Sequence, residues 1–298
     1  MSSNLYTHQA KNIFKTYVLM GVFLVVVIAI GYAAAWYMGN PTILYGAVVI
    51  AFAMNIYSYW ASDKLVLRMT NAVEADPVQH RELINIIENL SITAGLPMPR
   101  VYVVHDPSPN AFATGRNPEK AVVAATTGLL QILDRNELEG VMAHELAHVG
   151  NRDMLVMTVA VVLAGFVALV ADFFSRALMF DGNRDNRHPA FLIIGIVGII
   201  LAPIAAQLMQ MAVSRRREYL ADATGALLTR YPEGLASALE KISGANMPMK
   251  KASHATAHLF ISDPFAGGKR SLWQKVGGLF HTHPPATERI ARLRGMDV

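Results

Sequence analysis

Apolar residues along this chain fall in long blocks separated by ordinary mixed sequence. No charged residue occurs between Lys15 and Asp63, a stretch long enough for two membrane helices of about 20 residues each. The turn-forming run Gly39-Asn40-Pro41 divides this stretch near its middle. The pattern therefore predicts one span near residues 16–37 and a second near 42–61.

A cleaved signal peptide is the alternative for the first block, because three alanines, Ala33 to Ala35, follow an apolar core. The first apolar run is longer than the core of a typical signal peptide, and a second apolar run follows it directly. Both features favour two retained spans.

Two further uncharged blocks occupy Met154–Ala171 and Ala190–Ser214. The second is long enough to cross a bilayer, whereas the first is close to the lower limit, at about 27 Å of helix. A buried core helix is therefore an alternative for the first block. With both blocks counted as spans, the chain has four transmembrane helices.

The remaining segments mix charged and apolar residues as globular domains do. Residues 63–153 predict two helices and two strands: a helix over Arg81–Thr93, strands over Arg100–His105 and Ala121–Ala125, and a helix starting at Asp134, where Glu137 completes a capping box. After residue 214 the pattern predicts two short helices, over Ala236–Ile242 and Thr287–Leu293.

Composition agrees with a membrane protein. Only 16% of the residues are charged, against about 25% in average soluble proteins. The net charge is +4, but Lys and Arg gather beside apolar blocks, which indicates membrane orientation and not a nucleic-acid partner. The chain has no cysteine, so a metal site must use His, Asp or Glu.

The flanking charges predict how the chain is oriented. Lys11 and Lys15 precede the first span, the turn after it is uncharged, and Lys64 and Arg68 follow the second. Three arginines, Arg215 to Arg217, follow the fourth. By the positive-inside rule both termini are cytoplasmic, and residues 63–153 and 215–298 share that side.

The sequence His144-Glu145-Leu146-Ala147-His148 carries the chemistry. Histidines four residues apart on a helix share one face and can bind one metal ion. Glu145 lies beside the first ligand, where a carboxylate can act as general base on a zinc-activated water. This is the H-E-x-x-H motif of metalloproteases.

A catalytic zinc needs a third protein ligand and an open position. Glu218 is the candidate, and Asp222, one helical turn later, is positioned to accept a hydrogen bond from a ligand histidine. The alternative is a solvated helix in which Arg215–Arg217 pair locally with these acids. The hairpin formed by spans three and four favours the ligand, because it returns the chain to the side it left.

Three further sets of residues are weaker candidates. His254 and His258 also lie four apart, but Ala255 stands where the base would be. His283, before two prolines, and Arg289 could stabilise an oxyanion, although a turn residue is the alternative for His283. The small residues between the two predicted strands, Asn110, Ala111, Phe112, Ala113 and Thr114, could accept an extended substrate or form a plain loop.

Taken together, these motifs resemble the HtpX family of membrane-bound zinc metalloproteases, relatives of the CAAX prenyl endopeptidases. The resemblance rests on the two amino-terminal spans and four motifs: Asn110–Gly115, His144–His148 with Asn151-Arg152-Asp153, Arg216–Asp222, and His283-Pro284-Pro285. It implies one zinc ion per subunit bound by His144, His148 and Glu218, with Glu145 as base. It also raises the expectation that His283 and Arg289 assist the transition state.

The resemblance further implies a multi-pass protein of the bacterial inner membrane with cytoplasmic catalysis. Its role would be quality control under stress: cleavage of misfolded or damaged membrane proteins or unfolded polypeptides, alongside other membrane quality-control proteases. The expected fold class is a mainly α membrane protein with a small β-sheet, four transmembrane helices and a gluzincin-like zinc protease domain. The expected division is two spans (1–62), a first catalytic half (63–153), a transmembrane hairpin (154–214) and a second catalytic half (215–298).

Two other functions compete with this prediction. An intramembrane protease of the site-2 type would carry H-E-x-x-H inside a span, but charged residues flank the motif on both sides here. A scaffold with a structural zinc is the other, yet structural sites are usually closed by four ligands and often use cysteine. The intact Glu145 and the absence of cysteine argue against it.

Overall fold

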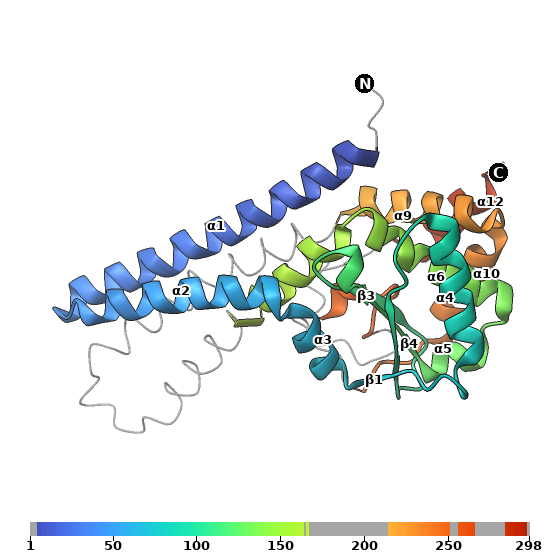
Figure 1. Ribbon diagram of the computed structural model, residues 1–298, viewed down its shortest axis with the longest axis horizontal. Coiled ribbons are helices and arrows are strands. Elements are labelled where there is room, and N and C mark those ends of the chain that lie inside the picture. Colours follow the sequence, from blue (N-terminus) through green and yellow to red (C-terminus); the bar gives the residue numbers. More distant parts are fainter. Residues whose placement is uncertain (1–4, 164, 167–213, 251–255, 266–283, 297–298) are drawn as a thin grey trace.

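The computed structural model describes residues 5–163, 165–166, 214–250, 256–265 and 284–296. They form a long helical hairpin joined to a mainly helical domain with one small sheet (Figure 1). The mainly α class with a small sheet is therefore confirmed. The predicted fourth span, up to residue 213, and the whole loop before it lie outside the described residues.

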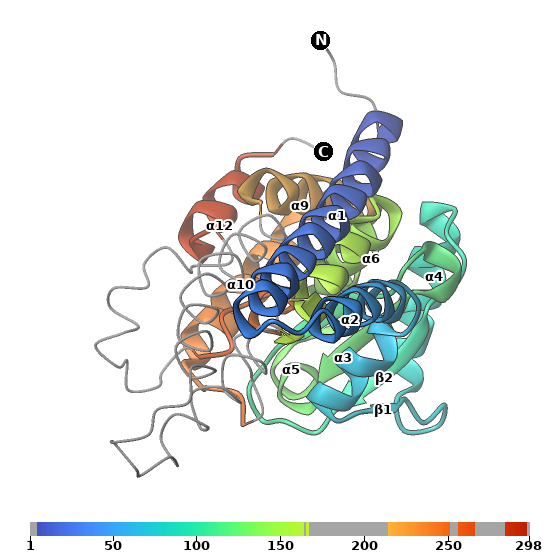
Figure 2. The same ribbon diagram turned by 90° about the vertical axis from the view of Figure 1, so that its left-hand side faces the viewer.

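The hairpin consists of α1 (Leu5–Met38) and α2 (Thr42–Trp60), which pack side by side (Figures 1 and 2). Within the described residues these are the two helices long and apolar enough to cross a membrane. α1 begins at Leu5, well before the predicted start of the span near residue 16. The extra turns carry Lys11 and Lys15 and extend the helix beyond its apolar part, since a helix need not end at the bilayer surface.

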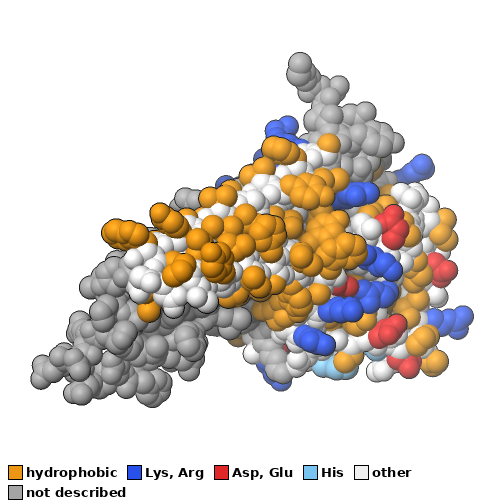
Figure 3. All heavy atoms as spheres, turned by 60° about the vertical axis from the view of Figure 1, so that its left-hand side comes forward, with side chains coloured by type: hydrophobic (Ala, Val, Ile, Leu, Met, Phe, Trp, Pro, Cys, Tyr) orange, Lys and Arg blue, Asp and Glu red, His pale blue; other side chains and the backbone are white. Residues whose placement is uncertain are grey.

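Large apolar side chains cover the outside of the hairpin. Figure 3 shows them over α1 and α2, with Lys and Arg gathered where the hairpin meets the domain. Trp36 is 79% exposed and Phe14 is 67% exposed. In water such a surface would be strongly unfavourable, whereas in a bilayer it contacts lipid chains.

Three short helices connect the hairpin and the sheet to the rest of the domain. α3 (Ser62–Thr70) follows α2, and α4 (Arg81–Ala94) confirms the predicted amphipathic helix. α5 (Thr127–Ile132) follows the sheet and is capped by the Thr126 hydroxyl, which accepts a hydrogen bond from the Leu129 N–H. Neither α3 nor α5 was predicted from the sequence.

The sheet has four strands in the order β1-β2-β4-β3. The predicted strands are β2 (Arg100–Val104) and β4 (Val122–Thr126), which pair in parallel. Two strands complete the edges in antiparallel fashion: β1 (Ala72–Glu74) beside β2 and β3 (Ala111–Thr114) beside β4. The sheet packs against α6 (Arg135–Gly150), the helix that carries the metal-binding motif.

A sharp bend follows α6 and redirects the chain toward the hairpin. Arg152 adopts a left-handed conformation (φ 57°), and a second helix, Asp153–Leu163, leaves at 82° to α6. Leu155, Val159 and Leu163 of this helix pack against Leu19 and Phe23 of α1. The described start of the third apolar block is therefore buried; how far it continues lies outside the described residues.

The carboxyl-terminal part packs on α6 from the other side. It contains α9 (Arg215–Thr229), α10 (Pro232–Ala245) and α12 (Ala286–Arg294), which contact one another. A short 3-10 turn, Ala257–Leu259, leads to an isolated bridge between Phe260 and Phe112 of β3. These helices bring Glu218 to α6, across about 70 residues of chain.

Candidate metal centre

Local sequence signals fix the start of α6 and the face that it presents. Asp134 accepts a hydrogen bond from the Glu137 N–H, and the Glu137 carboxylate accepts one from the Asp134 N–H, so the predicted capping box is confirmed. From this start, His144 and His148 fall on one face, and both rings are buried. Their planes are nearly perpendicular, with ring centroids 4.7 Å apart.

The α9 helix approaches α6 closely at this face because of one glycine. A Cβ atom on Gly225 would lie 3.0 Å from the backbone nitrogen of His144, tighter than ordinary packing allows. The absence of a side chain there lets the two helices pack closely. Glu218, seven residues or two turns earlier on α9, then faces both histidines.

Three ligand atoms converge in the interior. The Nε2 atoms of His144 and His148 are 3.2 Å apart, and the two Glu218 carboxylate oxygens lie 3.6 Å from Nε2 of His148 and 3.9 Å from Nε2 of His144. Ligands about 2.0–2.2 Å from a tetrahedral zinc ion lie about 3.3–3.6 Å from one another. Among the described residues this is the one cluster of three or more such side chains close enough to hold a metal ion, and its dimensions fit one.

Each histidine has a carboxylate behind it. Nδ1 of His144 lies 2.9 Å from Asp222, and Nδ1 of His148 lies 3.2 Å from Asp153. A carboxylate at Nδ1 keeps the proton on that nitrogen and leaves Nε2 free for a metal. Asp222 was predicted for this position; Asp153 entered the sequence argument only as part of a motif.

Arg289 of α12 reinforces the Asp222 side. Its Nε and Nη2 donate to the two Asp222 oxygens at 2.9 and 2.6 Å, and its Nη1 donates to the Ile261 carbonyl. Burial alone would raise the pKa of Asp222, but the Arg289 guanidinium outweighs it and lowers that pKa to about 2. Arg289 is itself 1% exposed, so its charge is balanced within the protein.

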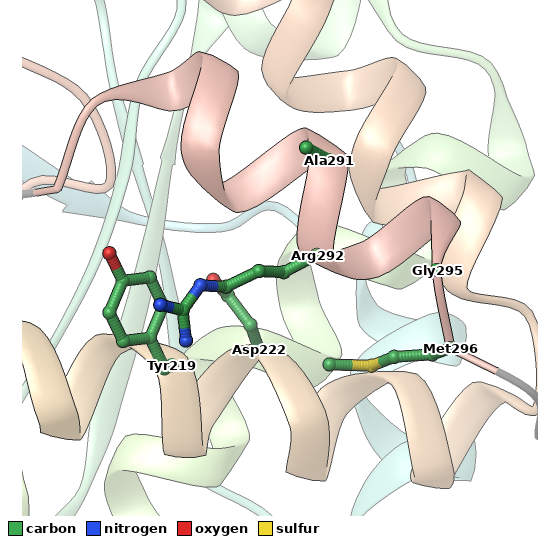
Figure 4. A pocket seen from close by; sticks show the side chains of 6 residues that line it. All are labelled: Tyr219, Asp222, Ala291, Arg292, Gly295 and Met296. Carbon is green, nitrogen blue, oxygen red and sulfur yellow. The ribbon is translucent and has the colours of Figure 1, made fainter.

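A hollow lies between α9 and α12, next to the metal centre. A cavity of about 400 Å³ lies between these helices, lined by Tyr219, Asp222 and Arg292 among others. Figure 4 shows the Asp222 side chain rising from α9 toward α12 and Arg292 extending over Tyr219, with its guanidinium carbon 3.8 Å from the ring centroid. Asp222 thus separates this hollow from the metal centre.

Glu145 is buried beside the cluster, with a backbone partner from the sheet. The Ala113 N–H of β3 donates to its carboxylate, and burial, the largest influence, raises the pKa of Glu145 to about 7. A carboxyl group that titrates near neutral pH suits a general base. The contact also brings β3 to the catalytic residue.

The predicted substrate segment forms strand β3 and its approach. Asn110 makes two hydrogen bonds with the backbone of Ser262, which lies on the adjacent segment of the same chain. Ile261 of that segment donates its N–H to the Ala111 carbonyl. Phe112 pairs with Phe260, and Thr114 meets Thr158. The Ala111 end of the outer edge is therefore covered by residues 260–262, whereas Ala113 lies next to Glu145.

The remaining candidates have different outcomes. His283 and His254 lie outside the described residues. His258 is buried, with Nε2 3.5 Å from the Met157 carbonyl, and does not belong to the cluster of three ligands. Arg289 contacts Asp222 and also the ligands, with Nη1 3.8 Å from Glu218 Oε2 and Nη2 3.4 Å from His144 Nδ1. Contact with the reacting oxygen stays a prediction.

Sequence reasoning missed two polar residues near the metal centre. One is Asp153, as the partner of His148, and the other is Arg217. The Arg217 Nε lies 3.7 Å from Asp153, and the side chain is buried. An acid five residues after the second histidine is a usable signal for Asp153 once a bend after α6 is expected. Arg217 follows two other arginines, and such a run is also typical of the solvated start of a helix. The sequence therefore has no signal that Arg217 is buried.

Comparison with known proteins decides the family. Residues 77–297 match the sequence model of peptidase family M48. The chain belongs to peptidase family M48. It is 46% identical to "Protease HtpX homolog" of Caldanaerobacter subterraneus subsp. tengcongensis, with 99% of this chain and 98% of that protein covered.

Further relatives agree. A "Protease HtpX homolog" of Tropheryma whipplei is 47% identical, with 98% of each chain covered. The crystal structure of S. mikatae Ste24p matches with a TM-score of 0.53 at 17% identity, covering 97% of this chain and 67% of that one, which indicates a shared fold. The predicted HtpX-type resemblance is confirmed, and this member of family M48 is a bacterial membrane metallopeptidase.

Proposed function

We propose that this chain is a zinc-dependent endopeptidase that uses Glu145 as its general base. The observation that carries the proposal is the convergence of His144, His148 and Glu218 on one point, with the buried Glu145 beside them. Three protein ligands from two helices are the set that catalytic zinc uses, with a further position left for water or substrate. Nitrogen and carboxylate ligands without sulfur fit zinc.

The residues of the chain divide the work of peptide hydrolysis. Zinc, when bound, would polarise the scissile carbonyl and lower the pKa of the attacking water. Glu145 takes a proton from that water and returns it to the leaving amine. Asp222 and Asp153 orient the two ligand rings, and Arg289 holds Asp222 in place.

An extended substrate is proposed to lie beside β3. The Ala113 end is favoured because it is next to Glu145, whereas the Ala111 carbonyl is already paired with Ile261. The small side chain of Ala113 allows the close approach that strand addition requires. His283 and Arg289 remain candidates for stabilising the oxyanion.

We further propose that the site faces the cytoplasm of a bacterium from its inner membrane. The contact between Asn12 and Asp153 supports this, because it brings the Lys-rich start of α1 beside the metal centre. Positive charge marks the cytoplasmic ends of membrane helices. We also propose four transmembrane helices and the division into residues 1–62, 63–153, 154–214 and 215–298, because two further uncharged blocks can return the chain to the same side.

The proposed substrates are misfolded or damaged membrane proteins and unfolded polypeptides, cleaved under stress. A site next to an apolar hairpin (Figure 3) suits chains that emerge from the bilayer. Other membrane quality-control proteases are proposed partners. No nucleic acid is expected.

The test is proteolysis of a membrane-protein substrate and of casein by the full chain in detergent. Glu145→Gln should keep zinc and lose at least about a thousandfold in rate, because the amide cannot accept the proton. The matched control is Glu139→Gln, the same change on the same helix at a half-buried position away from the ligands. Cleavage by Glu145→Gln at the control's rate would refute the mechanism.

A further inference from the structure

A polar side chain of the first membrane helix reaches the metal centre. Asn12 of α1 is 6% exposed, and its amide donates to Asp153 Oδ1 at 2.6 Å and to the Asn151 carbonyl at 3.1 Å. An amide on an apolar helix is unfavourable unless it is paired within the protein. This one pairs with residues about 140 positions away, at the end of α6.

Asp153 divides its two oxygens between the membrane helix and the metal ligand. Oδ1 accepts from Asn12 and has Arg217 3.7 Å away, while Oδ2 faces His148 Nδ1. Asp153 lies beyond the left-handed Arg152 that follows α6. The hydrogen bonds of α6 therefore do not fix this carboxylate, and contacts from other elements have to hold it.

The position of α1 relative to Asp153 is itself well determined. One turn after Asn12, the buried Thr16 donates its hydroxyl proton to the Asn12 carbonyl. Further along, Leu19 and Phe23 pack against Leu155 and Val159 of the helix that Asp153 begins. These contacts fix the register of α1 and keep the Asn12 amide at the carboxylate.

We propose that Asn12 is a positioning residue of the metal centre, acting through Asp153 on His148. The amino-terminal membrane hairpin is then part of the support of the metal, and not only an anchor. The inference rests on the zinc site proposed above. It predicts that the affinity for zinc depends on a side chain in the membrane helix.

The experiment measures zinc affinity of the full chain in detergent, by competition with a chelator of known affinity. Asn12→Leu removes the amide, keeps the side-chain size and suits a membrane helix. Outer partners of metal ligands are typically worth 10–100-fold in affinity, so the loss is expected to be about tenfold. Asn12→Gln retains the amide and should recover part of this loss.

The matched control is Asn55→Leu in α2. Asn55 is also 6% exposed, but its amide donates to the Ala51 carbonyl of its own helix. This variant should keep the affinity of the wild type within about twofold, the scatter expected for a site with no link to the metal. Melting temperatures of both variants report any general loss of packing.

A second pair of variants separates positioning from packing. In an Asp153→Ala background, Asn12→Leu should change the zinc affinity far less than in the wild type, because the oxygen that accepts from Asn12 is gone. Equal losses in both backgrounds, equal losses in Asn12→Leu and Asn55→Leu, or an unchanged affinity in Asn12→Leu would each overturn the inference. A wild-type chain that binds no zinc would instead refute the proposed function.

Discussion

The two histidine ligands differ in what holds them. His144 is supported by Asp222 and Arg289, both from helices of the carboxyl-terminal part. His148 is supported by Asp153, which is contacted by Asn12 from the membrane hairpin and by Arg217 from α9. One half of the metal centre is thus built within the domain, and the other half is built where the domain meets the membrane helix.

The difference is also one of charge. On the His144 side a buried arginine makes two hydrogen bonds to the supporting carboxylate, whereas on the His148 side a neutral amide makes one and the arginine is more distant. Charged, two-point contacts are more rigid and more costly to break than a single neutral one. Removing a support should therefore destabilise the fold on the first side and chiefly weaken metal binding on the second.

The largest expected effect is that of Asp222→Ala. It leaves the buried Arg289 charge without its two hydrogen bonds to a carboxylate and with only the more distant Glu218, 3.8 Å away. Breaking a buried pair in this way typically costs about 3–5 kcal/mol in the free energy of unfolding. Denaturant unfolding of the metal-free chain in detergent measures it. Asp153→Ala, which leaves only the neutral Asn12 amide and the more distant Arg217, should lose less; a larger loss there would reverse the comparison.

The next effect is the dependence of zinc uptake on pH. Burial lowers the pKa of His144 to about 4, so this ring is already neutral at pH 7. Burial also opposes the charge on His148, but the hydrogen bond to Asp153 and the nearby Glu218 outweigh it and raise that pKa to about 9. Of the two histidines, only His148 must then lose a proton when zinc binds.

Because the His148 pKa is raised, affinity should increase with pH and level off above about pH 9. Between pH 6 and 8 the rise should be about tenfold per pH unit, the value for one displaced proton. Titration calorimetry in buffers of different ionisation enthalpy counts the protons released. An affinity that does not change over this interval would show that both rings are already neutral.

A smaller effect is expected for Gly225→Ala. The added Cβ meets the α6 backbone at His144, 3.0 Å from its nitrogen, so the two helices must separate slightly. Overpacking of this kind costs about 1–3 kcal/mol. Thermal unfolding measures the loss, and Gly244→Ala, where a Cβ meets nothing within 4 Å, is the matched control.

The smallest effect is that of Arg292→Ala. Its ion pair with Glu288 is exposed, with 53% and 43% of the two side chains accessible, and such pairs contribute about 0–1 kcal/mol. The same helix thus carries one arginine, Arg289, on which the site depends and one on which it does not. A melting temperature of Arg292→Ala as low as that of Arg289→Ala would remove this distinction.

Local signals made much of this fold predictable. The capping box fixed the start of α6, and short runs rich in valine marked β2 and β4. Strand β3 was left open between loop and substrate segment, because its four residues are mostly small and include no valine or isoleucine. The spacing of four residues between Glu218 and Asp222 also sufficed to predict that both lie on one face of a helix.

The support of His148 could not be predicted in the same way. Asn12 is a single amide before an apolar run, and nothing in its neighbours indicates a partner 141 positions away. Asp153 follows a bend in which the left-handed residue is Arg152, and not the Gly150 or Asn151 that would adopt this conformation more easily. Contacts that depend on how a membrane hairpin packs onto a domain have no local signal.

The central claim is that His144, His148 and Glu218 together hold one zinc ion for Glu145 to act on. The most direct test is the zinc content of the purified full chain, measured for wild type, Glu145→Gln and Glu218→Ala. The first two should contain about one zinc ion per chain and the third almost none, because two histidines alone bind zinc weakly. Equal zinc content in all three would contradict the claim.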